Sequence, residues 1–119
     1  LGADMTATRN DGGTPAHFAA DYGHVAALKL LHDLGADMTA KRNDGRTPAY
    51  FAAFNGHAAA LKLLHDLGAD ITAKDNHGIT PAHEAAANGH AAALKLLHDL
   101  GADMTATRND GGTPAHFAA

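Results

Sequence analysis

Histidine is the residue type in this chain best suited to chemistry, because imidazole binds metals and transfers protons near neutral pH. Ten of the 119 residues are histidine. Most recur at a fixed period: His24, His57 and His90 lie 33 residues apart. Equivalent residues in stacked repeats are about 8–10 Å apart, whereas zinc holds its ligand atoms about 2 Å away. Histidines at this spacing do not converge on one ion, so we expect no metal site and no cofactor.

The sequence does not indicate an enzyme. It contains no Ser and no Cys to serve as a nucleophile. The run Asn10-Asp11-Gly12-Gly13 lacks the Lys and the preceding strand of a phosphate-binding loop. The net charge of −4 argues against nucleic acid, because a phosphate backbone is bound by clustered Lys and Arg. We therefore expect a non-enzymatic protein whose ligand is not a nucleic acid.

Hydropathy and cysteine usage bear on location. No apolar run approaches the length of a membrane span, and no signal peptide is present, so we expect no membrane insertion. The absence of cysteine favours a cytoplasmic location. A secreted effector and a part of a larger protein are the alternatives.

The elements that position these residues follow from the 33-residue period. Thr14-Pro15, Thr47-Pro48 and Thr80-Pro81 recur at this spacing. Such a period is typical of stacked repeats, in which each unit buries its apolar face against its neighbours. We predict a single array over 1–119, with units at 2–34, 35–67 and 68–100 and a partial unit at 101–119.

The second unit shows how each repeat is expected to fold. Asn43-Asp44-Gly45 predicts a tight turn. Thr47-Pro48 predicts a helix start, because Thr caps the first N–H groups and Pro suits the first helical position. Gly56 ends this Ala-rich helix. A second helix, with Leu along one face, is predicted from about Ala58 to Leu67.

A motif within each unit points to a family. The run Asp-Gly-Gly-Thr-Pro-Ala-His-Phe-Ala-Ala at 11–20, followed by Gly23-His24, Leu30-Leu31 and Gly35-Ala36-Asp37, recurs with few changes. It resembles the ankyrin-repeat family over essentially the full chain. The resemblance implies an all-α solenoid of helix-turn-helix units joined by β-turn or hairpin loops. It also implies that His17, His83 and His116 tie each helix start to the adjoining turn by hydrogen bonds.

The repeats depart from the family pattern at three places. Ala16 and its equivalents stand where Leu is usual, His32 and its equivalents stand at an expected Leu position, and Tyr50 replaces one motif His. Repeats this similar indicate recent duplication or design. The departures favour a natural array, and an engineered scaffold is the alternative.

The three full units differ mainly at the turn tips and first helices. Ten of 33 columns vary, whereas nothing changes from Ala26 to Leu34 and its equivalents. In ankyrin repeats the tips and first helices form a concave face that binds partners, so the resemblance implies a protein–protein interaction module. Neutral drift is the alternative, although drift would tend to give polar residues rather than Tyr22, Phe54 and Ile79. The predicted partner-binding residues are Asp11, Asp21, Tyr22, Asp44, Arg46, Phe51, Phe54, Asn55, His77, Ile79, Glu84 and Asn88.

The two ends of the sequence are related. Residues 1–20 and 100–119 are identical, so a three-unit block is the higher-order repeat. Leu1 stands where a second helix ends and Ala119 where a first helix ends, so each end is expected to expose a face that favours a neighbour. We expect either a segment of a longer array, acting as a spacer or filament, or head-to-tail stacking of copies.

Overall fold

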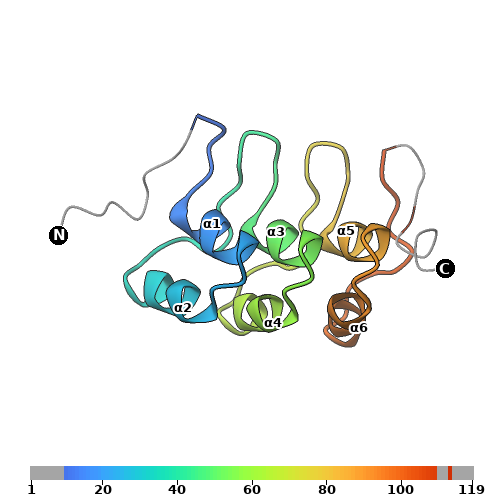
Figure 1. The fold of residues 1–119 in the computed structure, drawn as a ribbon. Helices are drawn as coiled ribbons and strands as arrows, with labels where there is room; N and C mark the ends of the chain where they lie inside the picture. Colours follow the sequence, from blue (N-terminus) through green and yellow to red (C-terminus); the bar gives the residue numbers. More distant parts are fainter. Residues whose placement is uncertain (1–9, 110–112, 114–119) are drawn as a thin grey trace.

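The computed structural model describes residues 10–109 and residue 113, and these residues form three stacked helix pairs (Figure 1). The helices are α1 (Pro15–Asp21), α2 (Val25–Asp33), α3 (Pro48–Phe54), α4 (Ala58–Asp66), α5 (Pro81–Ala87) and α6 (Ala91–Asp99). The first helices α1, α3 and α5 form one layer and the second helices α2, α4 and α6 the other. The predicted all-α solenoid is confirmed. Residues 110–112 and 114–119 of the predicted partial unit lie outside the described residues.

Each first helix begins as the sequence predicts. Thr47 precedes Pro48, and its hydroxyl accepts a hydrogen bond from the Tyr50 backbone N–H at 3.3 Å. α3 ends at Phe54, and Gly56 then takes a left-handed φ of 74°, which a residue with a side chain rarely adopts. α4 ends at Asp66, one residue before the predicted end.

The two layers pack by different means. Ala52 and Ala53 are fully buried, and such small side chains let neighbouring first helices approach closely. Leu61 and Leu64 of α4 are also fully buried, whereas Leu67 packs against the same core only in part. The leucine face predicted for the second helix therefore lies against the core.

Hairpin loops project from one edge of the array (Figure 1). In the second unit the Arg42 N–H donates to the Arg46 carbonyl at 2.9 Å and closes the hairpin. Successive tips are also joined: the Asn43 N–H donates to the Asp11 carbonyl and the Asn76 N–H to the Asp44 carbonyl, both at 2.9 Å. The tips therefore form a continuous edge beside the first helices.

The motif histidines have the role that the resemblance implied. The Thr14 N–H donates to His17 Nδ1 at 3.1 Å, so Nε2 carries the proton and donates to the Arg46 carbonyl at 2.9 Å. His83 accepts equivalently from the Thr80 N–H at 3.0 Å. His116 lies outside the described residues. Among the described residues, no group of three His, Cys, Asp or Glu side chains is arranged to hold a metal ion.

Candidate partner-binding groove

A hollow of about 610 Å³ lies between α1 and α3, on the side of the first helices. We call it the groove. Six of its lining residues belong to the predicted partner-binding set, and two do not. The predicted six are Asp21, Tyr22, Arg46, Phe51, Phe54 and Asn55, and the other two are Tyr50 and His57. Its volume falls within the range of sites that bind small ligands.

Aromatic rings give the groove its apolar surface. Tyr22 is 56% exposed and Phe54 is 42% exposed, although both rings are large and apolar. The Tyr50 ring stacks on the Phe54 ring with their centroids 6.3 Å apart, and it meets Phe51 edge-on at 5.2 Å. Rings held this way offer contact area at little entropic cost, which is a property of anchor sites in protein interfaces.

Arg46 covers one side of these rings. Its guanidinium carbon lies 4.7 Å from the centre of the Tyr50 ring, a cation–π geometry. Its Nε donates to Asp75 Oδ2 at 3.3 Å, and the Asp75 side chain is only 1% exposed. Asp75 Oδ1 also accepts from the backbone N–H groups of His77 and Ile79, at 2.8 and 2.9 Å. Arg46 is therefore fixed by the third hairpin as well as available to a ligand.

Burial changes the ionisation of two neighbours of Arg46. Burial, assisted by the nearby Glu84 carboxylate, raises the pKa of Tyr50 to about 12, so its phenol stays neutral into strongly alkaline solution. Burial also raises the pKa of Glu84, the α5 residue that replaces Phe. A partner cation near Glu84 would favour the ionised carboxylate that burial disfavours.

A second arginine braces Phe51. The Arg42 guanidinium carbon lies 4.8 Å from the centre of the Phe51 ring. Arg42 also pairs with Asp44 at 2.8 Å and with Asp11 at 3.6 Å. Asp44 and Asp11, two of the predicted binding residues, therefore hold neighbouring hairpin tips together through Arg42.

Three residues bridge the repeat boundary beneath the rings. The Asn55 side-chain amide donates to Asp21 Oδ1 at 2.6 Å and to the Asp21 carbonyl at 2.9 Å. His57 Nε2 lies 3.1 Å from the same carbonyl, within hydrogen-bond distance. Asp21 and Asn55 were predicted for partner binding, and the structure shows that they also lock the first repeat to the second.

The remaining predicted residues lie along the third repeat, away from the hollow. His77 is exposed at the third hairpin tip, and Ile79 is half-buried where that hairpin rejoins the helix. Asn88 follows α5, and its side-chain amide donates to the Glu84 carbonyl at 3.0 Å. The predicted set is thus split, with six residues around one hollow and the others spread along the tips and α5.

Sequence comparison missed two groove residues for different reasons. Tyr50 stands in a variable column, since His17 and His83 are its equivalents, and this replacement was the available signal. His57 is the same residue in all three units, so comparison between repeats has no means of marking it.

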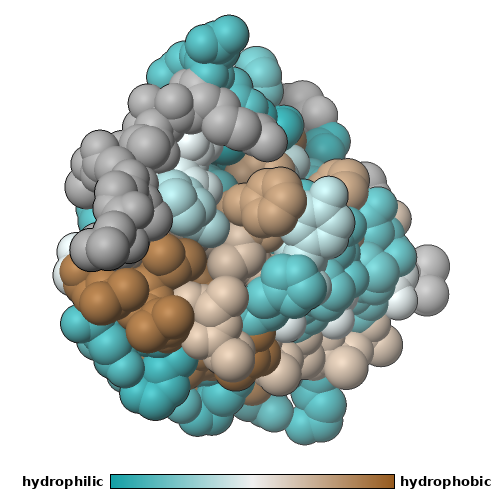
Figure 2. All heavy atoms as spheres, turned by 60° about the vertical axis from the view of Figure 1, so that its left-hand side comes forward, coloured by the Kyte–Doolittle hydropathy of each residue, from teal (hydrophilic) through white to brown (hydrophobic). Residues whose placement is uncertain are grey.

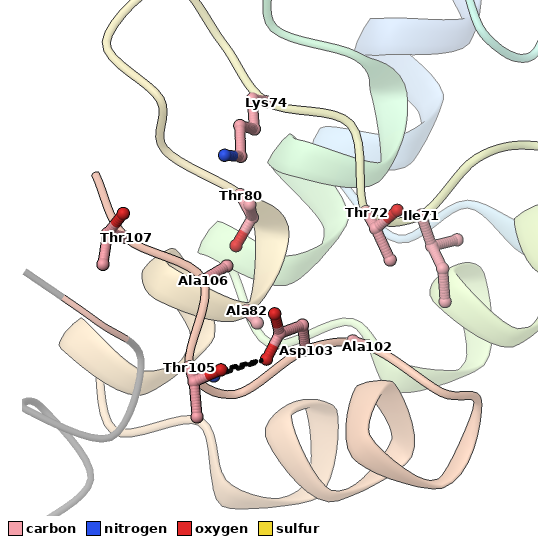
Figure 3. A pocket seen from close by; sticks show the side chains of 10 residues that line it. All are labelled: Ile71, Thr72, Lys74, Thr80, Ala82, Ala102, Asp103, Thr105, Ala106 and Thr107. Atoms are coloured by element: carbon pink, nitrogen blue, oxygen red, sulfur yellow. Dashed lines mark hydrogen bonds between the residues drawn. The ribbon is translucent and has the colours of Figure 1, made fainter. Parts of the chain in front are cut away.

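Another hollow, of about 440 Å³, lies between the third hairpin and the segment that follows α6 (Figure 3). Asp103 Oδ1 accepts from the Thr105 hydroxyl at 2.6 Å and from its backbone N–H at 2.8 Å. These bonds lower the pKa of Asp103, which makes it a weaker base. The described lining also holds Lys74 and several threonines but no histidine. We assign no chemistry to it.

Comparison with known families agrees with this architecture. A family model described as ankyrin repeats (3 copies) matches residues 1–75, and a second, described as ankyrin repeats (many copies), matches residues 58–98. Among curated proteins, none matches this chain. None of the helices among the described residues is long and apolar enough to cross a membrane.

Proposed function

Because this chain belongs to the ankyrin-repeat family, whose members are generally protein–protein interaction modules, we propose that it binds a protein partner through the groove and the adjoining hairpin tips. The observation that carries this proposal is the coincidence of variation and exposure. The exposed rings of Tyr22 and Phe54 occupy columns that differ between repeats, whereas the second helices are almost invariant. Ankyrin-repeat proteins are typically non-enzymatic, and we propose that residues 1–119 act as one binding array.

The chemistry of the groove indicates what kind of segment fits. Its rings suit an apolar side chain, and Arg46 suits a carboxylate or a backbone carbonyl. Beyond Arg46, Glu84 suits a Lys or Arg of the partner, since a cation there stabilises its ionised form. A short segment with an apolar anchor beside a basic residue satisfies these features.

Paired affinity captures test the proposal. The wild-type chain and its Phe54→Ala and Tyr22→Ala variants serve as baits for one lysate, and bound proteins are quantified. Phe54→Ala removes an exposed ring and should leave the fold intact, which circular dichroism checks. Lys62→Ala is the matched control, because Lys62 lies on the exposed face of α4 and pairs only with Asp66 among the described residues.

We expect proteins that the wild type and Lys62→Ala retain and the two ring variants lose. Truncation of a central aromatic anchor typically costs about 2 kcal/mol or more, which is roughly a thirtyfold loss of affinity. Proteins that the ring variants retain and Lys62→Ala loses would place binding on the second helices and contradict the proposal.

A second candidate function, the end-to-end stacking of copies, is favoured by a different surface. In the view toward the α1–α2 end, strongly hydrophobic side chains gather at the lower left (Figure 2). The exposed large hydrophobic residues of this repeat include Val25, Leu30 and Leu34. A patch of this kind typically marks an interaction site.

A further inference from the structure

Some of the charges on the groove side of the first helices are matched within the chain. Arg42 pairs with Asp44 at 2.8 Å and with Asp11 at 3.6 Å. Arg46 pairs with Asp75 at 3.3 Å and with Asp44 at 3.5 Å. The two arginines thus face three aspartates, so this cluster leaves no positive charge over for an acidic partner. Of the two acceptors proposed for Arg46, a backbone carbonyl therefore fits better than a carboxylate.

Two carboxylates on the same side, Asp21 and Glu84, are not matched in this way. Within the part of the chain that the structure describes, neither of them forms an ion pair with Lys, Arg or His. Asp21 Oδ1 accepts from the Asn55 side-chain amide at 2.6 Å, and that donor is neutral. The charge of Arg46 acts on Glu84, but this guanidinium already pairs with two aspartates. Both carboxylates therefore remain open to a cation from a partner.

The order of the first helices places these two carboxylates on opposite sides of the aromatic rings. In the layer of first helices, α3 lies between α1 and α5 and packs against both (Figure 1). Asp21 ends α1, and Glu84 lies in the first turn of α5. The rings of Tyr50 and Phe54 come from α3. The surface therefore runs from one carboxylate, across apolar rings, to a second carboxylate.

The rings beside Asp21 suit the side chain of a Lys or Arg. Asp21 and Tyr22 both line the groove, and the Tyr22 ring is 56% exposed. The face of an aromatic ring attracts a cation, and the aliphatic stem of Lys or Arg packs on apolar surface while its charged head reaches outward. The equivalents of Asp21 and Tyr22 in the second repeat, Phe54 and Asn55, are exposed as well. These two columns are therefore open inside the array.

We propose that the groove selects a basic segment of the partner protein, in which two Lys or Arg residues flank an apolar anchor. The apolar side chain packs on the rings of Tyr50 and Phe54, one cation pairs with Asp21, and the other pairs with Glu84. This inference rests on the proposed binding of a protein through the groove, and it specifies the class of segment that binds there. Complementary charge gives such a contact its selectivity against acidic segments.

The stacking of the repeats sets the spacing of the two basic residues. Neighbouring packed helices lie about 8–10 Å apart, so α1 and α5 lie about 16–20 Å apart across α3. An extended chain advances about 3.3 Å per residue, so the two basic residues are about five or six positions apart. The apolar anchor lies near the middle of this interval, because α3 is the central helix.

Selection from a displayed library of random short peptides tests the proposal. The library is applied in parallel to the wild type, to Phe54→Ala and to Asp66→Asn. Asp66 is exposed on α4 and pairs with Lys62, so Asp66→Asn changes the net charge as a groove variant would but leaves the groove intact. We expect peptides that are enriched on the wild type and on Asp66→Asn, are lost on Phe54→Ala, and carry the basic pair on either side of an apolar residue.

The possible failures of this selection are distinguishable. Enriched peptides that depend on Phe54 but are acidic, or that lack the basic pair, would overturn the basic segment and leave groove binding intact. Enrichment that is equal on Phe54→Ala, or absent on every chain, would overturn groove binding itself.

Calorimetry with one enriched peptide tests the two carboxylates separately. Asp21→Asn keeps an oxygen that accepts from the Asn55 amide, and Glu84→Gln keeps the shape of the side chain, so both variants should fold, which circular dichroism checks. Each should weaken binding about threefold to tenfold, because exposed charge pairs and cation–π contacts are individually modest. The difference from the wild type should shrink as salt is added. Affinities of both variants equal to that of Asp66→Asn would overturn the pairing of the peptide's cations with Asp21 and Glu84.

Discussion

The second helices have one role in the array, and the first helices with their hairpin tips have another. The second-helix layer is nearly invariant between repeats, and Leu61 and Leu64 of α4 are fully buried. The strip of first helices and tips holds most of the variable columns and exposes Tyr22 and Phe54. Identical second helices give identical interfaces between repeats, so the first helices can change without loss of the stack. Stability is concentrated in one layer and specificity in the other.

The largest expected effect lies in the second-helix layer. Leu61→Ala removes a fully buried side chain from the middle repeat and leaves a cavity. We therefore expect the free energy of unfolding to fall by about 2–5 kcal/mol. Phe54→Ala truncates a larger but exposed ring and should cost less than about 1 kcal/mol. Urea unfolding followed by circular dichroism measures both. Equal losses would remove the distinction between the layers.

Arg46 does not fit a strict division between a stabilising layer and a binding layer, because it supports the fold as well as the groove. Arg46→Ala leaves the buried Asp75 carboxylate with backbone donors alone and uncovers the Tyr50 ring. We expect a loss of about 1–3 kcal/mol in the free energy of unfolding. Lys41→Ala, an exposed change in the same hairpin, is the control in the same urea experiment. A loss no greater than that of the control would show that Arg46 serves binding alone.

Helix capping gives a smaller test. The Thr80 hydroxyl accepts from the His83 backbone N–H at 3.3 Å at the start of α5, whereas the second helices have no side-chain cap bond. Thr80→Ala should lower the free energy of unfolding by about 1 kcal/mol, and Thr80→Ser should restore most of it. Thermal unfolding of the wild type and the two variants measures these differences in stability. If Thr80→Ser and Thr80→Ala unfold at the same temperature, the cap bond does not stabilise α5.

The smallest effect at neutral pH concerns Tyr50 and emerges only in alkali. The folded pKa is raised to about 12 from 10, so the unfolded chain loses the phenol proton first. The contribution of the protonated Tyr50 phenol to the free energy of unfolding is therefore complete below pH 10 and is lost as the pH rises through 12. We expect the difference in stability between the wild type and Tyr50→Phe to change in this window. A difference that stays constant from pH 9 to 11.5 would contradict the burial of the phenol.

The sequence predicted the fold well because its signals are local and repeated. Thr47-Pro48 is a helix start signal and Gly56 a helix stop signal, and each acts within a few residues. The 33-residue period extends these helix boundaries to every unit. The site was predicted less completely. Variation identified Tyr22 and Phe54, but it had no means of showing that Asp21 and Asn55 bond to each other, because that contact joins different repeats. His57 was missed because it is the same residue in all three units, and comparison between repeats marks only residues that differ.

Hydrogen exchange on the chain alone and with a captured partner tests the division between the two layers most directly. The account predicts slower exchange, on binding, in the second hairpin and α3, from about residue 42 to residue 55, with α4 little changed. Groove variants such as Phe54→Ala should abolish that protection, while Lys62→Ala should preserve it. Protection confined to α4 and α6, with the hairpin tips and α3 unaffected, would contradict the account.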